Sequence, residues 1–349
     1  QLEGSVEDDH FPLTEPDIQW SKVSGPGTVS FGNAFQAVTE VTFPEPGMYG
    51  FQLSANDGAS TTSDWVSVLV DEGGRPTQKV FQLEFTPSDM VYDSQRGLVY
   101  LICEDGTVRR FNMANRTFEE PFEVGGQLHA GDITPDSSYL YLADLETSNN
   151  MGQIHRLDLE TGDVTTITYE LYSSESGCYD IAIGAAGQAM FTGYEKETPL
   201  RELNLETHEV VRVPMYDDRA REIMFRASTS IRRSGDYSRF VLDGEDGNYY
   251  YETKYRSIRN PDGQGPGAAA INHDGSLYVE GYGNCVFDSE FNIKQNGLNM
   301  GYGGLIFHPK KPVLLGVNAA AKKLKAVNVE SGEENFRITL DTNDDLYRR

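Results

Sequence analysis

The sequence lacks the motifs that mark several common enzyme and metal-binding classes. Its three cysteines, Cys103, Cys178 and Cys285, stand at unrelated spacings and form no CxxC pair, which argues against zinc binding and dithiol redox chemistry. Neither an HxxxH nor an HExxH pattern occurs among the six histidines. There is also no P-loop and no GxGxxG after a predicted strand. No cofactor is therefore predicted, with calcium as the one exception discussed below.

Basic charge is scarce as well. Lys and Arg total 29 residues against 54 Asp and Glu, which gives a formal net charge of -25. A field of that sign repels nucleic acid and anionic membrane surfaces. No apolar run reaches the roughly 20 residues of a membrane helix, and no signal peptide is present. We expect no nucleic-acid partner and no direct membrane insertion by this fragment.

Long helical patterns are missing too. No extended stretch combines helical periodicity with end caps, whereas 35 Gly, 19 Tyr and 17 Phe suit short strands and many turns. Short pieces that read as a β-strand, a turn and a second β-strand recur along the chain. Within them, Asn112, Asp158 and Asn204 hold the same place, 46 residues apart each time. A fixed period of this size is the signature of a β-propeller, and the fold class predicted is all-β.

The first unit, residues 1–71, has its own pattern of short strands and turns, which indicates an Ig-like β-sandwich. Trp20 is the expected core residue, and Tyr49, after Gly47, is placed like the tyrosine of a sandwich corner. The run W-x-x-V-S-G-P-G-x-V-x-F, followed by F-x-x-P-G-x-Y and A-x-D-G, resembles the PKD-type Ig-like domains of bacterial surface and secreted proteins. Such domains usually carry one strand before the L-x-G-S-V-x-D-D segment. The resemblance therefore implies that this unit lacks its first strand and that the chain is a fragment.

A polar linker with Gly and Pro, residues 72–79, separates this unit from a predicted propeller at 80–349. The innermost strands of its blades are predicted to begin at residues 89, 132, 180, 222, 268 and 304. The turns of the form D-G-x-V-x-x-x-N and D-L-E-T-G resemble those of YVTN-type propellers over roughly residues 85–340. Residues 80–85 read as an extra strand, so we predict six recognisable blades, or seven with missing C-terminal sequence. Three consecutive tyrosines, residues 249–251, are predicted to pack between blades.

A ligand site is expected where the loops that enter the innermost strands gather at one mouth of the axis. The side chains assigned to this mouth are His129, Tyr179, Arg221, Tyr302, Asp132 and Asp180. Aromatic rings stack on apolar faces of sugars and Arg pairs with carboxylates, so this set suits a glycan or a charged small molecule. A structural alternative stays open, because an Asp that begins an inner strand can simply accept backbone N–H groups.

Calcium is the one metal considered. Asp8, Asp9, Asp57 and Asp64 fall in turn regions of the first unit, and Ca²⁺ requires several oxygen ligands together. Ordinary Asx turns explain the same residues equally directly.

Together these features predict a secreted or cell-surface binding or adhesion module that recognises glycans or a surface protein through the propeller face. The sequence favours a non-catalytic role, and no catalytic residue is assigned. One alternative is a carbohydrate-active enzyme, a polysaccharide lyase or hydrolase that uses the axial pocket. A second alternative is a structural scaffold of a surface assembly that binds no ligand.

Overall fold

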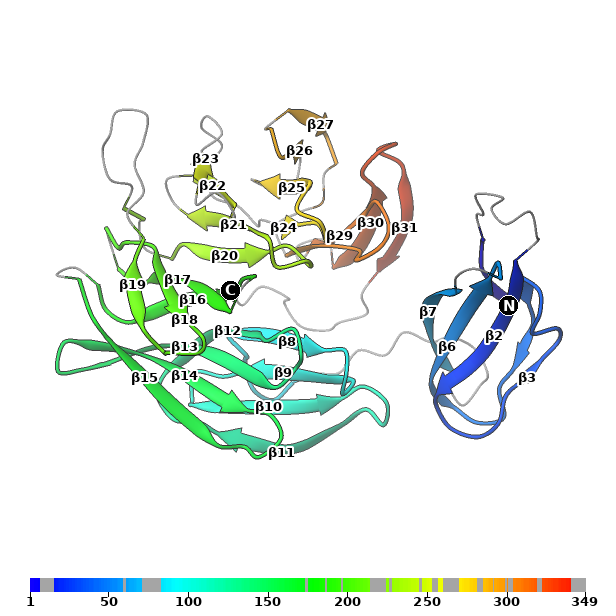
Figure 1. The fold of residues 1–349 in the computed structure, drawn as a ribbon, viewed down its shortest axis with the longest axis horizontal. Helices are drawn as coiled ribbons and strands as arrows, with labels where there is room; N and C mark the ends of the chain where they lie inside the picture. Colours follow the sequence, from blue (N-terminus) through cyan, green and yellow to red (C-terminus); the bar gives the residue numbers. More distant parts are fainter. Residues whose placement is uncertain are drawn as a thin grey trace. The chain divides into compact units, whose positions relative to one another are not determined.

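The computed structural model describes residues 1–6, 16–58, 61–70, 83–172, 175–185, 187–195, 197–213, 224–225, 228–244, 247–252, 257–259, 270–280, 285–290, 292–298, 300, 304–318 and 322–339. Throughout these residues the secondary structure is β-strand and turn, as the sequence predicts (Figure 1). No helix in the described part is long and apolar enough to cross a membrane. The chain divides into two compact units, which are taken separately below.

The first unit is built from antiparallel strands in three small sheets, ordered β2-β6-β7, β1-β4 and β3-β5. Its strands are β1 (Leu2–Glu3), β2 (Asp17–Ser24), β3 (Ser30–Phe31), β4 (Val38–Thr39), β5 (Val41–Thr42), β6 (Gly47–Asn56) and β7 (Thr61–Val70). These strands are consistent with the predicted sandwich.

Both aromatic residues predicted for the core of this unit are buried. Trp20 is 5% exposed and donates its indole N–H to the carbonyl oxygen of Ala37 at 3.1 Å. Tyr49 is fully buried, and its hydroxyl donates to the carbonyl oxygen of Glu45, four residues upstream, at 2.6 Å. That bond ties the turn before β6 to the core, which is how the tyrosine of a sandwich corner acts.

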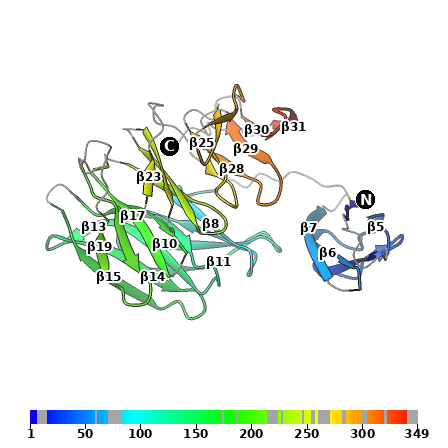
Figure 2. The same cartoon turned by 45° about the horizontal axis from the view of Figure 1, so that its top comes forward.

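The second unit contains six four-stranded antiparallel sheets, the blades of a β-propeller, seen from a second direction in Figure 2. Blade one is β8 (Asp89–Asp93), β9 (Leu98–Ile102), β10 (Thr107–Asn112) and β11 (Thr117–Glu123); blade two is β12 (Leu128–Ile133), β13 (Tyr139–Ser148), β14 (Met151–Asp158) and β15 (Val164–Glu170). Blade three is β16 (Cys178–Ile183), β17 (Gln188–Gly193), β18 (Arg201–Asn204) and β19 (Val210–Arg212); blade four is β20 (Ser230–Arg233), β21 (Arg239–Gly244), β22 (Gly247–Glu252) and β23 (Ser257–Arg259). Blade five is β24 (Ala270–Ile271), β25 (Leu277–Glu280), β26 (Cys285–Asp288) and β27 (Ile293–Gln295); blade six is β28 (Leu305–Phe307), β29 (Val313–Asn318), β30 (Lys323–Asn328) and β31 (Glu334–Thr339).

The side chains that recur with the 46-residue period cap the turn between the third and fourth strands of a blade. Asn112, Asp158 and Asn204 each accept, through one side-chain oxygen, the backbone N–H groups two and three residues ahead, at 2.8–3.3 Å. Asn328 makes the same pair of bonds in blade six. The repeat in the sequence is therefore a repeat of Asx turns, which fix the outer hairpin of each of these blades.

Apolar side chains are buried between consecutive blades. Separate buried clusters join blades one and two, two and three, three and four, four and five, and five and six. The predicted tyrosines of blade four belong to this packing: Tyr250 lies in the cluster shared with blade five, and Tyr251 lies in the cluster shared with blade three. Five interfaces of one kind therefore hold six blades in order.

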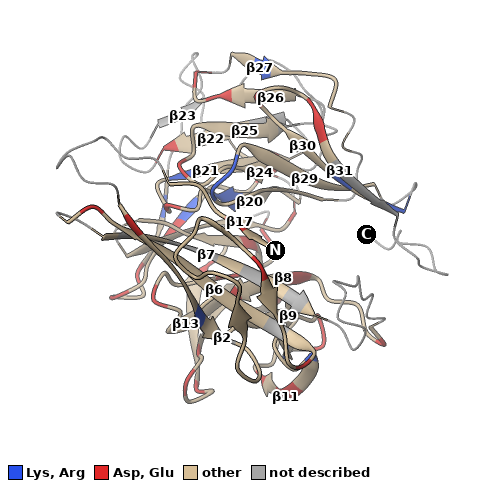
Figure 3. Cartoon of the chain, turned by 90° about the vertical axis from the view of Figure 1, so that its right-hand side faces the viewer, with Lys and Arg blue, Asp and Glu red and all other residues tan. Residues whose placement is uncertain are grey.

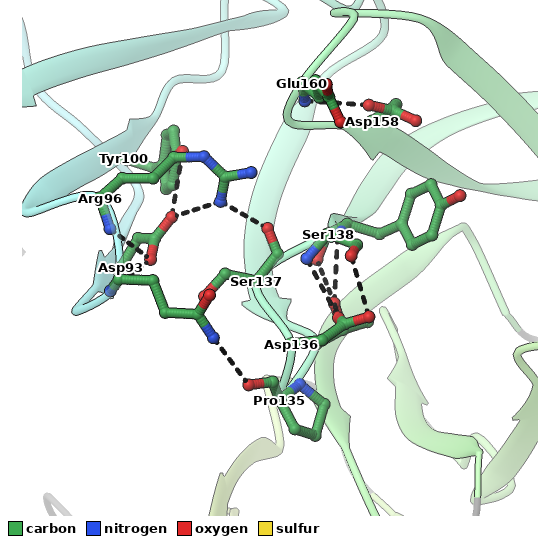
Figure 4. Close-up of polar contacts among 12 residues, drawn as sticks. Asp93, Arg96, Tyr100, Pro135, Asp136, Ser137, Ser138, Asp158 and Glu160 are labelled. Atoms are coloured by element: carbon green, nitrogen blue, oxygen red, sulfur yellow. Dashed lines mark hydrogen bonds and ion pairs between the residues drawn. The ribbon is translucent and has the colours of Figure 1, made fainter.

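Polar contacts reinforce these interfaces at the hairpin turns. Arg96, in the turn after β8, donates to the carboxylate of Asp93 at 2.9 Å and to the carbonyl oxygen of Ser137 in blade two at 2.6 Å. Figure 4 shows this guanidinium between the turns of the two blades, with the Asp136 carboxylate capping the second turn. These bonds hold the pKa of both the Asp93 and the Asp136 carboxyl below its usual range.

Two predicted strands are wrong. The inner strand of blade four is β20 and not residues 222–226; Phe225 instead pairs with Thr198 of blade three through two backbone hydrogen bonds of 2.8 Å. Of the extra strand predicted over 80–85, residues 83–85 are described and are not in a strand. Residues 80–82 and the predicted linker at 72–79 lie outside the described residues.

Candidate functional site

Two of the predicted ligand-binding residues occupy matching places in neighbouring blades. His129 lies in β12 and Tyr179 lies in β16, so both belong to the inner strands themselves and not to the loops before them, because these strands begin earlier than the sequence predicts. Each residue stands at a β-bulge, where the register shifts against the second strand of the blade. A bulge re-aims a side chain relative to a regular ladder, and bulges are common beside functional sites.

The two bulged residues form part of a row of three rings. The imidazole of His129 and the phenol of Tyr179 have their centroids 4.3 Å apart at an interplanar angle of 33°. Tyr179 in turn stacks on Tyr194, which follows β17, at 5.8 Å and 13°. All three side chains are half-buried. We call His129, Tyr179 and Tyr194 the aromatic row.

Hydrogen bonding fixes the imidazole in this row. The Nδ1 atom of His129 lies 2.8 Å from the backbone oxygen of Tyr179. A carbonyl oxygen only accepts, so Nδ1 carries the proton and Nε2 of the neutral ring is an acceptor. Burial raises the pKa of the Tyr179 phenol, so this hydroxyl stays protonated near neutral pH. The row therefore offers ring faces together with a polar acceptor and a hydroxyl group.

The predicted carboxylates are held by backbone amides. Asp180 accepts the N–H of Ile181 in its own strand at 2.8 Å and the N–H of Ile231 in the next blade at 2.9 Å. Asp132 does the same with Ile133 at 2.9 Å and Ile183 at 2.8 Å.

Asp89 extends this pattern back to blade one, because it binds the N–H of Met90 at 2.8 Å and that of Gly131 at 3.1 Å. Each carboxylate thus joins two consecutive inner strands, which favours the structural alternative for Asp132 and Asp180.

Two arginines that the sequence reasoning did not select complete this group. Arg233 binds both carboxylate oxygens of Asp132, with Nε–Oδ2 of 2.5 Å and Nη2–Oδ1 of 3.0 Å. Arg232 binds Oδ2 of Asp180 at 3.0 Å. Both belong to β20, whose basic residues appear blue in Figure 3, whereas Asp and Glu are spread over many strand ends and turns. Burial and the nearby Asp180 carboxylate raise the pKa of Asp89 to about 6.

The remaining predicted mouth residues cannot be placed. Arg221 and Tyr302 lie outside the described residues, and blade four presents Arg232 and Arg233 instead. The structure therefore brings together His129 and Tyr179 as a surface for contact, and Asp132 and Asp180 as structural acceptors. Tyr194 and the two arginines were missed because each meets its partners through the fold rather than through nearby sequence.

The calcium prediction stays a prediction. Asp8 and Asp9 lie outside the described residues, and the same holds for the side chain of Asp64. Asp57 lies in the turn after β6, where Asn56 accepts the N–H of Gly58 at 2.7 Å in an Asx turn. Across the described part of the chain, no three His, Cys, Asp or Glu side chains are grouped so that they could hold a metal ion.

Comparison with known proteins agrees with the two-part organisation. Residues 1–70 match a family model of a PKD domain, so the first unit is a PKD-type domain. A solved chain of Kuenenia stuttgartiensis hydrazine synthase is similar in fold, with a TM-score of 0.53 at 11% identity. The match covers 74% of this chain and 81% of that one. At that identity the likeness concerns the fold alone. A PKD domain next to a propeller is an arrangement typical of extracellular binding modules.

Proposed function

We propose that this protein is an extracellular binding module that recognises a glycan through the aromatic row of blades two and three. The observation that carries the proposal is the stacking of His129, Tyr179 and Tyr194 at half-buried positions. Sugar rings present apolar C–H faces that pack on such rings, and their hydroxyl groups bond to polar atoms at the ring edges. The imidazole acceptor and the tyrosine hydroxyl group supply those polar atoms.

The two alternatives have less support. An enzyme requires a proton donor or acceptor with freedom to react. The predicted carboxylates Asp132 and Asp180 are instead occupied by backbone amides and arginines. A scaffold without a ligand gives no reason for two bulges that both present aromatic side chains at one place. Recognition of a surface protein by the same rings is the remaining possibility within the binding class.

The test is one incubation series with neutral and acidic polysaccharides, with and without calcium. Retention of the protein and formation of new chain ends are measured in the same samples. We expect retention without cleavage. We expect the Tyr179→Ala variant to bind about 10-fold more weakly, since one aromatic contact contributes on the order of 1 kcal/mol. The matched control is Tyr172→Ala, because Tyr172 is an exposed tyrosine that stacks against Arg212 of the outer strand of blade three.

Each outcome has a distinct meaning. Equal loss of binding in Tyr172→Ala would remove the aromatic row from the proposal. New chain ends that disappear in a His129→Ala/Tyr179→Phe variant would make the protein a carbohydrate-active enzyme. Neither retention nor cleavage across the panel would favour a protein partner or the scaffold. Retention that chelation abolishes would restore the calcium site predicted at Asp8, Asp9, Asp57 and Asp64.

A further inference from the structure

The inner strands of the propeller have two faces, and each face has a defined neighbour. In β12, Ile133 belongs to the core shared with blade one, and a Cβ on Gly131 would lie 2.7 Å from Ile102 of blade one. In β16, Ile181 and Ile183 belong to the core shared with blade two. These alternate positions therefore pack on the preceding blade. Residues between them, such as Ala182, pack on the following blade.

In blade one, the positions that should face a preceding blade are exposed. Counted back from the hairpin turn, Met90 and Tyr92 of β8 correspond to Gly131 and Ile133 of β12. Met90 is 67% exposed and Tyr92 is 57% exposed. Val91 between them is 8% exposed, because it packs in the core shared with blade two. Within the described residues, only the face of β8 that points back along the blade order lacks a neighbour.

Blade six shows the complementary pattern. Ile306 of β28 corresponds to Ala182 of β16, so it faces the place of a following blade, and it is 66% exposed. On the same face, Leu315 pairs with Ile306 and is half-buried. Phe307 and Leu314 point to the opposite face and are buried in the core shared with blade five.

The ring therefore has one seam that differs from its five interfaces. Among the described residues, no buried cluster joins blade six to blade one, whereas one joins each of the other consecutive pairs. The seam has an apolar wall on each side, with Met90 and Tyr92 on one wall and Ile306 on the other.

We propose that this seam binds a seventh blade, a four-stranded antiparallel sheet that is apolar on both faces. The argument is continuity with the established interface. One wall presents what a blade packs on from behind, and the other presents what it packs on from ahead, so one inserted blade covers both walls at once. A second copy of the chain fits less well. Its blade one would cover one wall only and leave the same walls open at both ends of the pair, which is a head-to-tail contact without closure.

The first experiment measures the width of the seam. Sheets pack about 10 Å apart face to face, so room for one blade puts blades one and six about 20 Å apart. We expect a Tyr92→Cys/Ile306→Cys variant to form no disulfide under mild oxidation, because a disulfide requires Cα atoms within about 7 Å. A bifunctional thiol reagent about 20 Å long should join the two sites. Cys103 and Cys178 are buried, so only Cys285 needs replacement, by Cys285→Ser. Rapid disulfide formation would show that six blades close on themselves and would overturn the proposal.

The second experiment supplies a blade. A second copy of residues 124–171, which is blade two with the loop before it, is placed after residue 339. We expect the extended chain to melt at a higher temperature. We also expect Met90→Asp to lower its Tm by about 5 °C more than it lowers the Tm of the parent chain, because only the extended chain buries that side chain.

The control is Ile293→Asp, since Ile293 is 57% exposed on the outermost strand of blade five. Equal effects of Met90→Asp in both chains would overturn the proposal. So would a dimer of the parent chain, seen in sedimentation, that Ile306→Asp dissociates, because the occupant would then be a second copy.

Discussion

Removal of the Asp180 carboxylate tests whether the carboxylates between inner strands hold the propeller together. In the Asp180→Ala variant, the buried N–H groups of Ile181 and Ile231 lose their acceptor, and the Arg232 guanidinium loses a partner at 3.0 Å. Each buried amide left without a partner costs about 1–3 kcal/mol. Arg232 is half-exposed, so its ion pair contributes about 1 kcal/mol or less.

Part of this loss is offset. Burial raises the pKa of Asp180, which means that the carboxylate itself is costly to bury, and the variant no longer carries that cost. We therefore expect the free energy of unfolding of the propeller to fall by about 3 kcal/mol.

Urea unfolding followed by two probes makes the assay specific. Both tryptophans, Trp20 and Trp65, belong to the first unit, so tryptophan emission reports on that unit, whereas far-UV circular dichroism is dominated by the propeller. The midpoint from circular dichroism should fall with an unchanged slope, and the midpoint from emission should stay in place. Asp136→Ala is the control, because this exposed carboxylate caps a turn within one blade. An unchanged circular dichroism midpoint, or an equal loss in the control, would refute the reasoning.

Three further predictions concern single side chains. The pKa of Asp89 is raised to about 6 in the folded protein, so its protonated form stabilises the fold fully below pH 4 and this contribution is lost as pH rises to 6. In urea titrations, the stability of the wild type relative to Asp89→Asn should fall by up to about 3 kcal/mol between pH 4 and 7, and a flat difference would contradict this. Arg201→Met leaves the buried Glu175 carboxylate without its 2.5–3.0 Å partner, so circular dichroism should show a loss of about 3–5 kcal/mol. Tyr49→Phe removes only the hydroxyl bond to Glu45, and tryptophan emission should report a loss of about 1 kcal/mol with the propeller transition unchanged.

The parts of the fold that the sequence predicts are those that local chemistry determines. Asn112, Asp158 and Asn204 recur because each caps a hairpin within three residues of itself, so the blade period is visible along the chain. Tyr49 is recognisable for the same reason, since its partner lies four residues away. Turn chemistry and strand alternation therefore suffice for the fold class and for most of the strands.

The inner strand of blade four and the contacts at the axis depend on distant residues. Residues 222–226 look more like a strand than β20, which contains Arg232 and Arg233. Those arginines become strand residues because their partners are Asp180, 52 residues earlier, and Asp132, 101 residues earlier. The aromatic row was half predicted: His129 and Tyr179 stand just before conspicuous aspartates, whereas Tyr194 stacks from the far end of a hairpin.

The bonds of the inner-strand aspartates also run in one direction. Each of Asp89, Asp132 and Asp180 reaches forward to an amide of the blade that follows it in the sequence. During synthesis from the N-terminus, Asp89 leaves the ribosome 42 residues ahead of that amide, and the other two lead by 51. Each carboxylate is then held in water until the next blade emerges to bind it. Blades one to four are thus wired for assembly in the order of translation, and each finished blade offers the next one an attachment point.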